Sequence, residues 1–400
     1  MVKSLVASAA VGPTLSHAVT RTRSSAIRDL LEITERPEII SLAGGLPTPA
    51  AFPVELIATA TAQILAETPE SALQYGATEG FGPLRDLLAA TYDTDRAAVT
   101  VTHGSQQALE LVARATTDPG QVIAMADPGY VGAIQAFRTV GAELAGIPSD
   151  EHGMRVDVLA DRLAAGLRPT LVYVVANFDN PTGATLSAER RDRLADLAER
   201  YGFWVIDDDP YGSLRWSGST LAPMRARSAR VISLGTVSKT VCPGLRVGWA
   251  IAPPELARSL AILKQAADLH TSSLSQHIVH RVLAAPGFVS GHLPTISARY
   301  RHQADVLVAA LGDQLGDAIS FRRPDGGMFL WVELGDTEAS ASAIDTSALL
   351  EVALGQGMAF VPGSAFSVEA GHRRSLRLSF ATTEPADLVE AVRRLRLALG

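Results

Sequence analysis

Cysteine is almost absent from this chain of 400 residues, which contains only Cys242. One thiol excludes an intrachain disulfide and a cysteine-cluster metal site, and we predict no metal. The scarcity of cysteine also fits a reducing compartment, so we expect the protein in the cytoplasm. The sequence suggests no histidine partner for Cys242, which we interpret as a small packed residue rather than a catalytic thiol.

The sequence also lacks a candidate membrane span, a basic surface stripe and a dinucleotide-binding fingerprint. No run approaches the roughly 18 apolar residues of a membrane span. The net charge is −7 and no basic stripe stands out, which argues against nucleic acid as a partner. No G-x-G-x-x-G follows a predicted strand, which excludes a Rossmann-type dehydrogenase. The first residues resemble a short signal peptide, but serines interrupt their apolar run, and we expect a mobile arm.

What the chain does contain indicates a large buried core, because 47% of its residues are hydrophobic and only 19% are charged. Short apolar runs alternate with helical stretches between about residues 95 and 255. One such stretch has Ser187 placed to cap its start and Gly202 to end it. We therefore predict an α/β fold with a large, doubly wound and mostly parallel sheet. Its strands are predicted at residues 98–102, 122–126, 171–176, 203–207, 231–234 and 247–251.

The C-terminal third has a different pattern, typical of a smaller α+β domain to which both chain ends contribute. The predicted elements are helices over 254–284 and 294–315, strands near 328–333 and 375–381, and a final helix over 385–399. The predicted division is an N-terminal arm and small-domain segment over 1–50, a large domain over 51–290 and a small domain over 291–400.

Polar motifs follow several of the predicted strands, where ligands bind in sheets of this kind. Gly104, Ser105 and Gln106 open a helix, and its backbone N–H groups could hold a phosphate. Tyr130, in Asp-Pro-Gly-Tyr, could stack on a flat ring or be an ordinary packed aromatic. Asn180 opens an Asn-Pro turn, and its amide could instead donate to a phenolate or carboxylate.

Three consecutive acids, residues 207–209, end a buried strand and are followed by Tyr211. Buried carboxylates are costly unless they are paired. A metal or phosphoryl-transfer site would supply a partner, but a metal would need further ligands at matched strand ends, and none is evident. A protonated pyridine nitrogen also supplies the partner, and a carboxylate beside it keeps the ring able to accept electrons.

Two residues with hydroxyl groups, Thr236 and Ser238, come shortly before Lys239, and Arg246 follows it. An amine can form an imine with an aldehyde, while hydroxyl and guanidinium groups hold a phosphate. Pyridoxal phosphate is the cofactor that needs both. A further arginine, Arg377, lies in Ser-Leu-Arg near the C-terminus.

The order of these motifs resembles that of the fold type I, pyridoxal-phosphate-dependent aminotransferases of class I/II. The motifs run Gly-Ser-Gln, Tyr, Asn-Pro-Thr-Gly, Asp-x-x-Tyr, Ser-Lys, Gly-Leu-Arg and a C-terminal Arg. The resemblance covers about residues 20–400, and within the family the chain looks most like the 2-aminoadipate/kynurenine aminotransferase branch. The segments similar to that branch are 25–31, 42–47, 73–80, 267–271 and 326–331.

The resemblance implies roles for the residues around the cofactor. Lys239 would hold pyridoxal phosphate as an imine and then shuttle a proton. Asp208 would pair with the ring nitrogen, and Tyr130 would stack on the ring. Tyr211 and Asn180 would bond the ring oxygen. The implied phosphate ligands are Gly104, Ser105, Gln106, Thr236, Ser238 and Arg246, joined by Tyr75 from a partner subunit.

Substrate contacts follow from the same resemblance. Arg377 would grip the substrate α-carboxylate, helped by Asn180. Gly44 and Gly45 would line the substrate, and Arg28 could reach its far end. The chain departs from the family at Asp179, where glutamine is common. This acid would disfavour acidic side chains if it points inward, or it would cap the turn.

The activity implied is transfer of an amino group between an L-amino acid and a 2-oxo acid, with 2-oxoglutarate the expected acceptor, by a ping-pong mechanism in a homodimer. The same cofactor residues would serve a lyase, a β- or γ-substitution or a carbon–carbon condensation. A regulator with an aminotransferase-like domain is disfavoured, because the resemblance begins near residue 20.

Overall fold

The computed structural model describes residues 16–20, 36–335 and 345–400, and its largest element is an eight-stranded sheet. The strand order is β2-β9-β8-β7-β6-β3-β4-β5, and the pairs β4/β3, β3/β6, β6/β7 and β7/β8 are parallel. The predicted α/β class with a mostly parallel, doubly wound sheet is confirmed. The strands are β2 (Val99–Thr102), β3 (Val122–Asp127), β4 (Glu143–Asp150), β5 (Gly153–Met154), β6 (Pro169–Val174), β7 (Trp204–Asp208), β8 (Val231–Thr236) and β9 (Gly248–Ile251).

Helices cover both faces of this sheet, and successive residues of a strand pack into two different cores. Leu171 and Tyr173 of β6 lie in one core, with the helices α6 and α7. Val172 and Val174 lie in the other, with α8 and α9. Because both faces are buried, these strands are nearly continuously apolar. The helices are α3 (Val54–Glu67), α4 (Pro69–Leu73), α5 (Gly82–Thr91), α6 (Gly104–Thr116), α7 (Val131–Thr139), α8 (Val156–Ala164), α9 (Ala188–Tyr201), α10 (Pro254–Ala267) and α11 (Ser273–Ala284).

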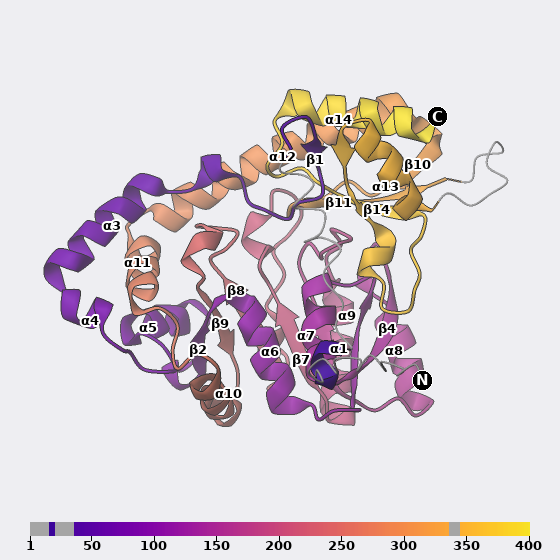
Figure 1. Cartoon of the computed structure of the whole chain (residues 1–400). Helices are drawn as coiled ribbons and strands as arrows, with labels where there is room; N and C mark the ends of the chain where they lie inside the picture. Colours follow the sequence, from indigo (N-terminus) through magenta and orange to yellow (C-terminus); the bar gives the residue numbers. More distant parts are fainter. Residues whose placement is uncertain (1–15, 21–35, 336–344) are drawn as a thin grey trace, which may run out of the picture.

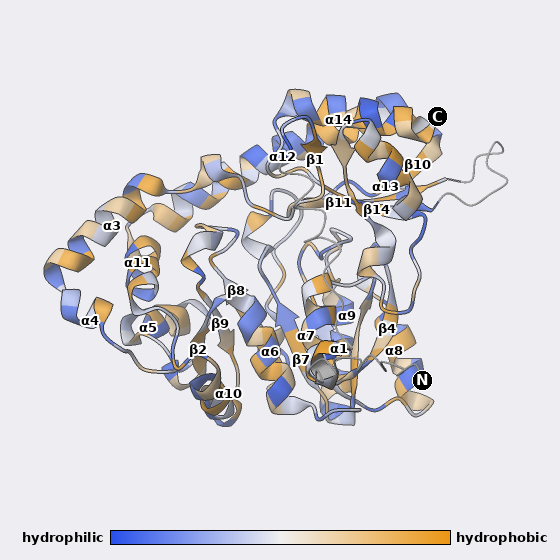
Figure 2. Ribbon diagram, in the orientation of Figure 1, coloured by the Kyte–Doolittle hydropathy of each residue, from blue (hydrophilic) through white to orange (hydrophobic). Residues whose placement is uncertain are grey.

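A smaller, antiparallel sheet of order β10-β11-β14-β13 is formed by the C-terminal part of the chain, near the top of Figure 1. Ile40 and Ser41 pair with Met358 and Ala359, so a segment from the N-terminal part lies beside the C-terminal one. Figure 2 shows hydrophilic and hydrophobic residues alternating along α14, whose apolar side is buried. The elements are α1 (His17–Thr20), β1 (Ile40–Ser41), α12 (Phe288–Leu315), β10 (Ile319–Phe321), β11 (Phe329–Leu334), α13 (Thr346–Gly355), β12 (Met358–Ala359), β13 (Val361–Pro362), β14 (Ser375–Ser379) and α14 (Pro385–Leu399).

Two helix predictions differ from the structure in their bounds. The expected helix over 254–284 is interrupted between α10 and α11, where Leu269 has a left-handed backbone (φ 66°) and Ser272 caps the next helix. The helix expected to start at 294 begins at Phe288 and contains Pro294. By contrast, α9 has the predicted ends: the Ser187 hydroxyl accepts from the Arg190 N–H at 3.3 Å, and Gly202 is left-handed.

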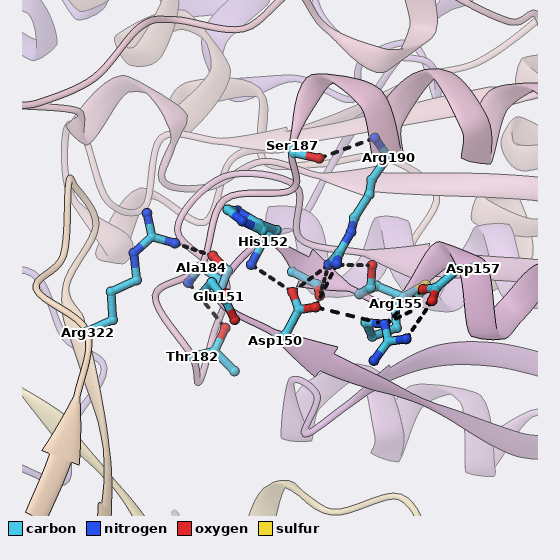
Figure 3. Close-up of polar contacts among 12 residues, drawn as sticks. Asp150, Glu151, His152, Arg155, Asp157, Thr182, Ala184, Ser187, Arg190 and Arg322 are labelled. Carbon is cyan, nitrogen blue, oxygen red and sulfur yellow. Dashed lines mark hydrogen bonds and ion pairs between the residues drawn. The ribbon is translucent and has the colours of Figure 1, made fainter.

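The hairpin β4–β5, which the sequence did not indicate, is fixed by charged groups (Figure 3). Arg190 of α9 donates to Asp150 with N–O distances of 2.6 Å, and Arg155 lies beside the same carboxylate at 3.9 Å. Arg322, next to β10, donates to the carbonyl oxygen of Glu151. These contacts attach the hairpin to a large-sheet helix and to the smaller sheet.

Within residues 16–20, 36–335 and 345–400, no helix is both long and apolar enough to cross a membrane. The predicted mobile arm falls on the first residues of the chain, and residues 1–15 lie outside the part that the structure describes. The predicted division of the chain at residues 50 and 290 stays a prediction.

Candidate active site

A cavity of about 520 Å³ lies beyond the carboxyl ends of several strands of the large sheet. Segments that follow β2, β3, β6, β7 and β8 meet there, together with residues 45 and 46 and a side chain of β14. Most of the residues that the sequence singled out are brought together in this place. They are Gly45, Gly104, Ser105, Gln106, Tyr130, Asn180, Asp208, Tyr211, Thr236, Ser238, Lys239, Arg246 and Arg377.

Lys239 follows β8 and extends its amine into the cavity, where Nζ donates to the carbonyl oxygen of Gly45 at 2.6 Å. Burial, together with the positive charges of Arg377 and Arg246, lowers the pKa of this amine to about 8. Both effects disfavour the ammonium form. Lys239 is therefore available as a neutral nucleophile and base closer to neutral pH than an ordinary lysine.

Asp208 is the only one of the three consecutive acids that lines the cavity, because alternate residues of β7 face opposite sides of the sheet. Its Oδ2 accepts from the Tyr173 hydroxyl at 3.1 Å, and its buried Oδ1 has no partner within the described part of the chain. Burial raises the pKa of Asp208 to about 7. An unpartnered carboxyl oxygen at a cavity wall suits a cationic ligand group.

Asp207 and Asp209 point elsewhere. Asp209 accepts from Asn177 at 3.0 Å and from the Gly212 N–H at 2.7 Å, which fixes the turn that carries Tyr211. Burial raises the pKa of Asp207 to about 7, and the charge of Asp209 contributes to this shift. The first and third acids thus belong to the scaffold of the site.

An anion cradle is formed where the start of α6 meets the loop after β8. Gly104 has φ +71° at the helix start, with the Arg246 guanidinium beside it. The Thr236 hydroxyl donates to the Ser238 hydroxyl at 2.9 Å and accepts from the Ser238 N–H at 3.1 Å. Free backbone N–H groups, hydroxyls and a guanidinium together bind a phosphate well.

Gly248 lets β9 approach this cradle closely. A Cβ at this position would lie 2.6 Å from the carbonyl carbon of Gly104 and from the nitrogen of Ser105. Both contacts are with backbone, which cannot move aside as a flexible side chain could. Glycine at 248 is therefore part of the cradle, although the sequence pattern did not single it out.

Arg377 projects from β14 toward the large sheet and is only 1% exposed. Its guanidinium donates to the Asn180 side-chain oxygen at 2.8 Å and to the Ala43 carbonyl at 2.5 Å. The rings of Phe329 and Phe366 lie 4.3 and 5.0 Å from its central carbon. Burial lowers the pKa of Arg377 to about 10. The hydrogen-bond partners given for it among the described residues are an amide oxygen and a carbonyl oxygen, not a carboxylate, so it is suited to receive a carboxylate from a ligand.

Tyr130 and Tyr211 supply aromatic surface and hydroxyl groups to the cavity wall. The Tyr130 hydroxyl donates to Gln106 at 3.3 Å, and the Gln106 amide donates to the carbonyl oxygen of Gly132 at 2.8 Å. The ring of Tyr211 meets Phe329 edge to face, with centroids 5.7 Å apart. Burial raises the pKa of Tyr130 to about 12 and that of Tyr211 further, so both hydroxyls stay protonated donors.

Together these groups fit pyridoxal phosphate. The cradle suits the phosphate of the cofactor, and the amine of Lys239 suits its aldehyde. The unpartnered oxygen of Asp208 suits its ring nitrogen. Arg377 remains for the carboxylate of an amino acid. The cavity therefore has a complementary group for each reactive part of the cofactor and for the invariant part of an amino-acid substrate.

Some predicted residues are not in the cavity. Gly44 is not among its lining residues, although Gly45 is. Tyr75 is 78% exposed and lines a separate hollow of about 430 Å³. Arg28 lies outside the described residues. Asp179 does not line the cavity and accepts from the Thr182 hydroxyl at 2.8 Å, so it caps the turn, which was one of the two expectations.

The sequence analysis missed several lining residues. Tyr173 lies within an apolar strand with no motif around it, and its sequence context predicts an ordinary core residue. The others were not singled out as site residues, although some of them lie within or next to the motifs that were. They are Leu46, Val131, Gly132, Gln135, Val175, Pro210 and Pro243.

Comparison with known proteins gives consistent matches over nearly the whole chain. Residues 37–395 match the family described as aminotransferase class I and II. The aromatic-amino-acid aminotransferase 1 of Thermococcus litoralis is 40% identical, with 93% of this chain and 91% of that protein covered. The 2-aminoadipate transaminase of Thermus thermophilus is 41% identical, with 95% and 94% covered. The kynurenine aminotransferase of Pyrococcus horikoshii, solved with PMP, has a TM-score of 0.91 at 37% identity, with 96% of each chain covered.

Proposed function

The chain belongs to the aminotransferase class I and II family, and from this premise we propose which residues perform each part of the transfer. The protein is an aminotransferase that uses pyridoxal phosphate and acts on amino acids. When bound, the cofactor withdraws electrons from the substrate Cα and carries the amino group between two half-reactions. The residues of this chain bind, orient and move protons around it.

Lys239 is proposed to hold the cofactor and to move the proton at the substrate Cα. The observation that carries this proposal is its half-buried amine, which has a lowered pKa and opens into the same cavity as Asp208 and Arg377. Asp208 would keep the ring nitrogen protonated. Tyr211 and Asn180 would donate to the ring oxygen, and Tyr130 would stack on the ring. The phosphate would be held by Gly104, Ser105, Gln106, Thr236, Ser238 and Arg246.

Arg377 is proposed to bind the substrate α-carboxylate with its planar guanidinium, which Asn180 holds on one side. Gly45 lines the substrate side of the cavity. We propose 2-oxoglutarate as the amino acceptor and a ping-pong order, because one cavity with one receptor for an α-carboxylate serves the amino acid and the 2-oxo acid in turn.

Tyr75 is proposed to act in the cavity of a second copy of the chain. Its side chain is exposed and lies outside the cavity of its own chain. A homodimer with shared sites would bring it to the phosphate of the neighbour. We propose that this dimer works in the cytoplasm on free amino acids.

Absorption spectra of the purified protein test the proposal. We expect a visible band from bound cofactor that is lost in Lys239→Ala. One class of amino acids should bleach it to a pyridoxamine-like spectrum without a second substrate, and 2-oxoglutarate should restore it. Initial rates at several fixed concentrations of the second substrate should give parallel double-reciprocal lines. Release of ammonia or of a side-chain fragment would instead indicate a lyase or substitution reaction.

A further inference from the structure

Tyr173 lies beside Asp208 on the wall of the active-site cavity. It is on β6, opposite Ile206 of the neighbouring strand β7. Because side chains of a strand alternate, Asp208 lies on the same face as Ile206, one diagonal step from Tyr173. This face packs against α6 and α7, where the ring of Phe137 meets Tyr173 edge to face at 5.5 Å between centroids. The ring of Tyr173 is thus held in place by packing, and only 2% of the residue is exposed.

The hydroxyl of Tyr173 donates to Oδ2 of Asp208 at 3.1 Å, in a buried position. It is the only side-chain or backbone donor to this carboxyl group among the described residues. The other oxygen, Oδ1, is buried and has no partner there. One oxygen is therefore fixed from the strand side, and the carboxyl group can turn only its second oxygen to a ligand.

We propose that Tyr173 is a positioning residue, which holds Asp208 so that Oδ1 faces the ring nitrogen of the cofactor and which stabilises the ionised carboxylate. The inference rests on the proposed pairing of Asp208 with that nitrogen. A hydrogen bond donated to a carboxylate favours its charged form. Burial raises the pKa of Tyr173 well above its usual value, so the hydroxyl stays protonated and remains a donor at every working pH.

The alternative is that Tyr173 is a core tyrosine that needs a partner for its hydroxyl. Two features favour positioning. Tyr173 itself lines the cavity, and its partner is the one carboxylate among the lining residues, although two other acids lie next to that carboxylate in the sequence. A purely structural hydroxyl would affect stability. A positioning hydroxyl would also change properties of the cofactor.

Tyr173→Phe tests the inference, with Tyr300→Phe as the matched control. Tyr300 is likewise fully buried, and its hydroxyl accepts from the Thr48 N–H at 3.1 Å, but it does not line the cavity. In the full-length chain depleted of cofactor, we expect Tyr173→Phe to weaken binding of pyridoxal phosphate about tenfold, as for loss of one hydrogen bond to a charged group. Tyr300→Phe should bind as the wild type does.

The visible spectrum of the cofactor-loaded variants gives a second measurement. With a less ionised Asp208, the ring holds less positive charge, so the pH midpoint of the visible absorption change should move upward in Tyr173→Phe and stay unchanged in Tyr300→Phe. Equal affinity and an equal midpoint in both variants would overturn the inference. A wild-type protein that bound no pyridoxal phosphate would instead overturn the proposed function.

A double-mutant cycle separates positioning from general destabilisation. If Tyr173 acts through Asp208, the tyrosine substitution should have little further effect on cofactor affinity in an Asp208→Asn background. Additive losses in the double variant would show that Tyr173 acts independently of Asp208 and would contradict the inference. Circular dichroism of each variant verifies that affinity is compared between folded proteins.

Discussion

At the scale of single residues, the candidate active site brings together ionisable groups, of which Asp208 and Arg377 are buried. Lys239, Asp208 and Arg377 all have pKa values shifted toward neutrality by burial. Such groups reduce stability unless a partner compensates them. A ligand that pairs with all three would explain their clustering in one cavity, and perturbed groups of this kind are typical of functional sites.

Arg377→Lys should weaken substrate binding far more than it slows turnover. An ammonium cannot reproduce the planar, two-pronged contact of a guanidinium with a carboxylate. We expect KM for the amino donor to rise roughly 10- to 100-fold, as for loss of one hydrogen bond to a charged group, with a smaller change in kcat. Steady-state kinetics measure this, with the exposed Arg301→Lys as control. An unchanged KM would exclude Arg377 as the carboxylate receptor.

The pKa of Lys239, lowered to about 8, predicts the pH dependence of cofactor incorporation. The neutral amine is the reactive form, so its fraction rises with pH and is nearly complete above about 9. The rate at which cofactor-free protein incorporates pyridoxal phosphate should therefore rise through about pH 8 and then level off. Borohydride reduction followed by peptide mapping identifies the modified lysine. A rate that continued to rise above pH 10 would contradict the lowered pKa.

At the scale of elements, the anion cradle depends on how closely β9 passes the start of α6. Gly248→Ala would place a methyl group 2.6 Å from backbone atoms, so the helix start must shift. Forcing a methyl into packed structure costs about 1–3 kcal/mol, and the shift should also weaken cofactor binding. Urea unfolding and titration with pyridoxal phosphate measure both effects.

Gly312→Ala is the matched control for this substitution. Gly312 lies inside α12, and a Cβ there meets nothing within 4 Å. Because alanine favours a helix over glycine, we expect a gain of roughly 0.5–1 kcal/mol in the free energy of unfolding and unchanged cofactor affinity. If both variants bound the cofactor equally well, the close approach of β9 would have no part in the site.

At the scale of the whole molecule, three buried acids make the cofactor-free protein sensitive to alkaline pH. Burial raises the pKa values of Asp179, Asp207 and Asp208 to about 7, from an ordinary value of 3.8. Between these values the native state binds more protons than the unfolded state. The contribution of these acids to stability is therefore complete below about pH 4 and is lost as the pH rises through 7.

The free energy of unfolding of cofactor-free protein should accordingly be lower at pH 8 than at pH 5, as measured by urea denaturation. Asp207→Asn, which removes one of the two acids that lie outside the cavity, should reduce this difference. Bound pyridoxal phosphate should also reduce it, because its ring nitrogen compensates Asp208. Stability that is equal at both pH values, or higher at pH 8, would contradict the raised pKa values.

Much of this organisation could be predicted from the sequence, because its signals are local. Continuous apolar runs indicated strands covered on both faces, and Ser187 and Gly202 defined the ends of α9. The motifs at strand ends fell into one cavity because parallel strands present their carboxyl ends at one edge. The hairpin β4–β5 and the break between α10 and α11 were missed, since Leu269 and the charged contacts of Asp150 carry no distinctive pattern.

The sequence by itself therefore determined the sheet, the order of the motifs and the identity of Lys239, Asp208 and Arg377 as candidates. Only the tertiary structure decided that one oxygen of Asp208 has no partner among the described residues, that Asp179 turns to Thr182, and that Tyr173 donates to Asp208. The physical reason is that residue type and spacing specify local backbone geometry. Burial and hydrogen-bond partners instead depend on segments distant in the chain, such as β6 beside β7.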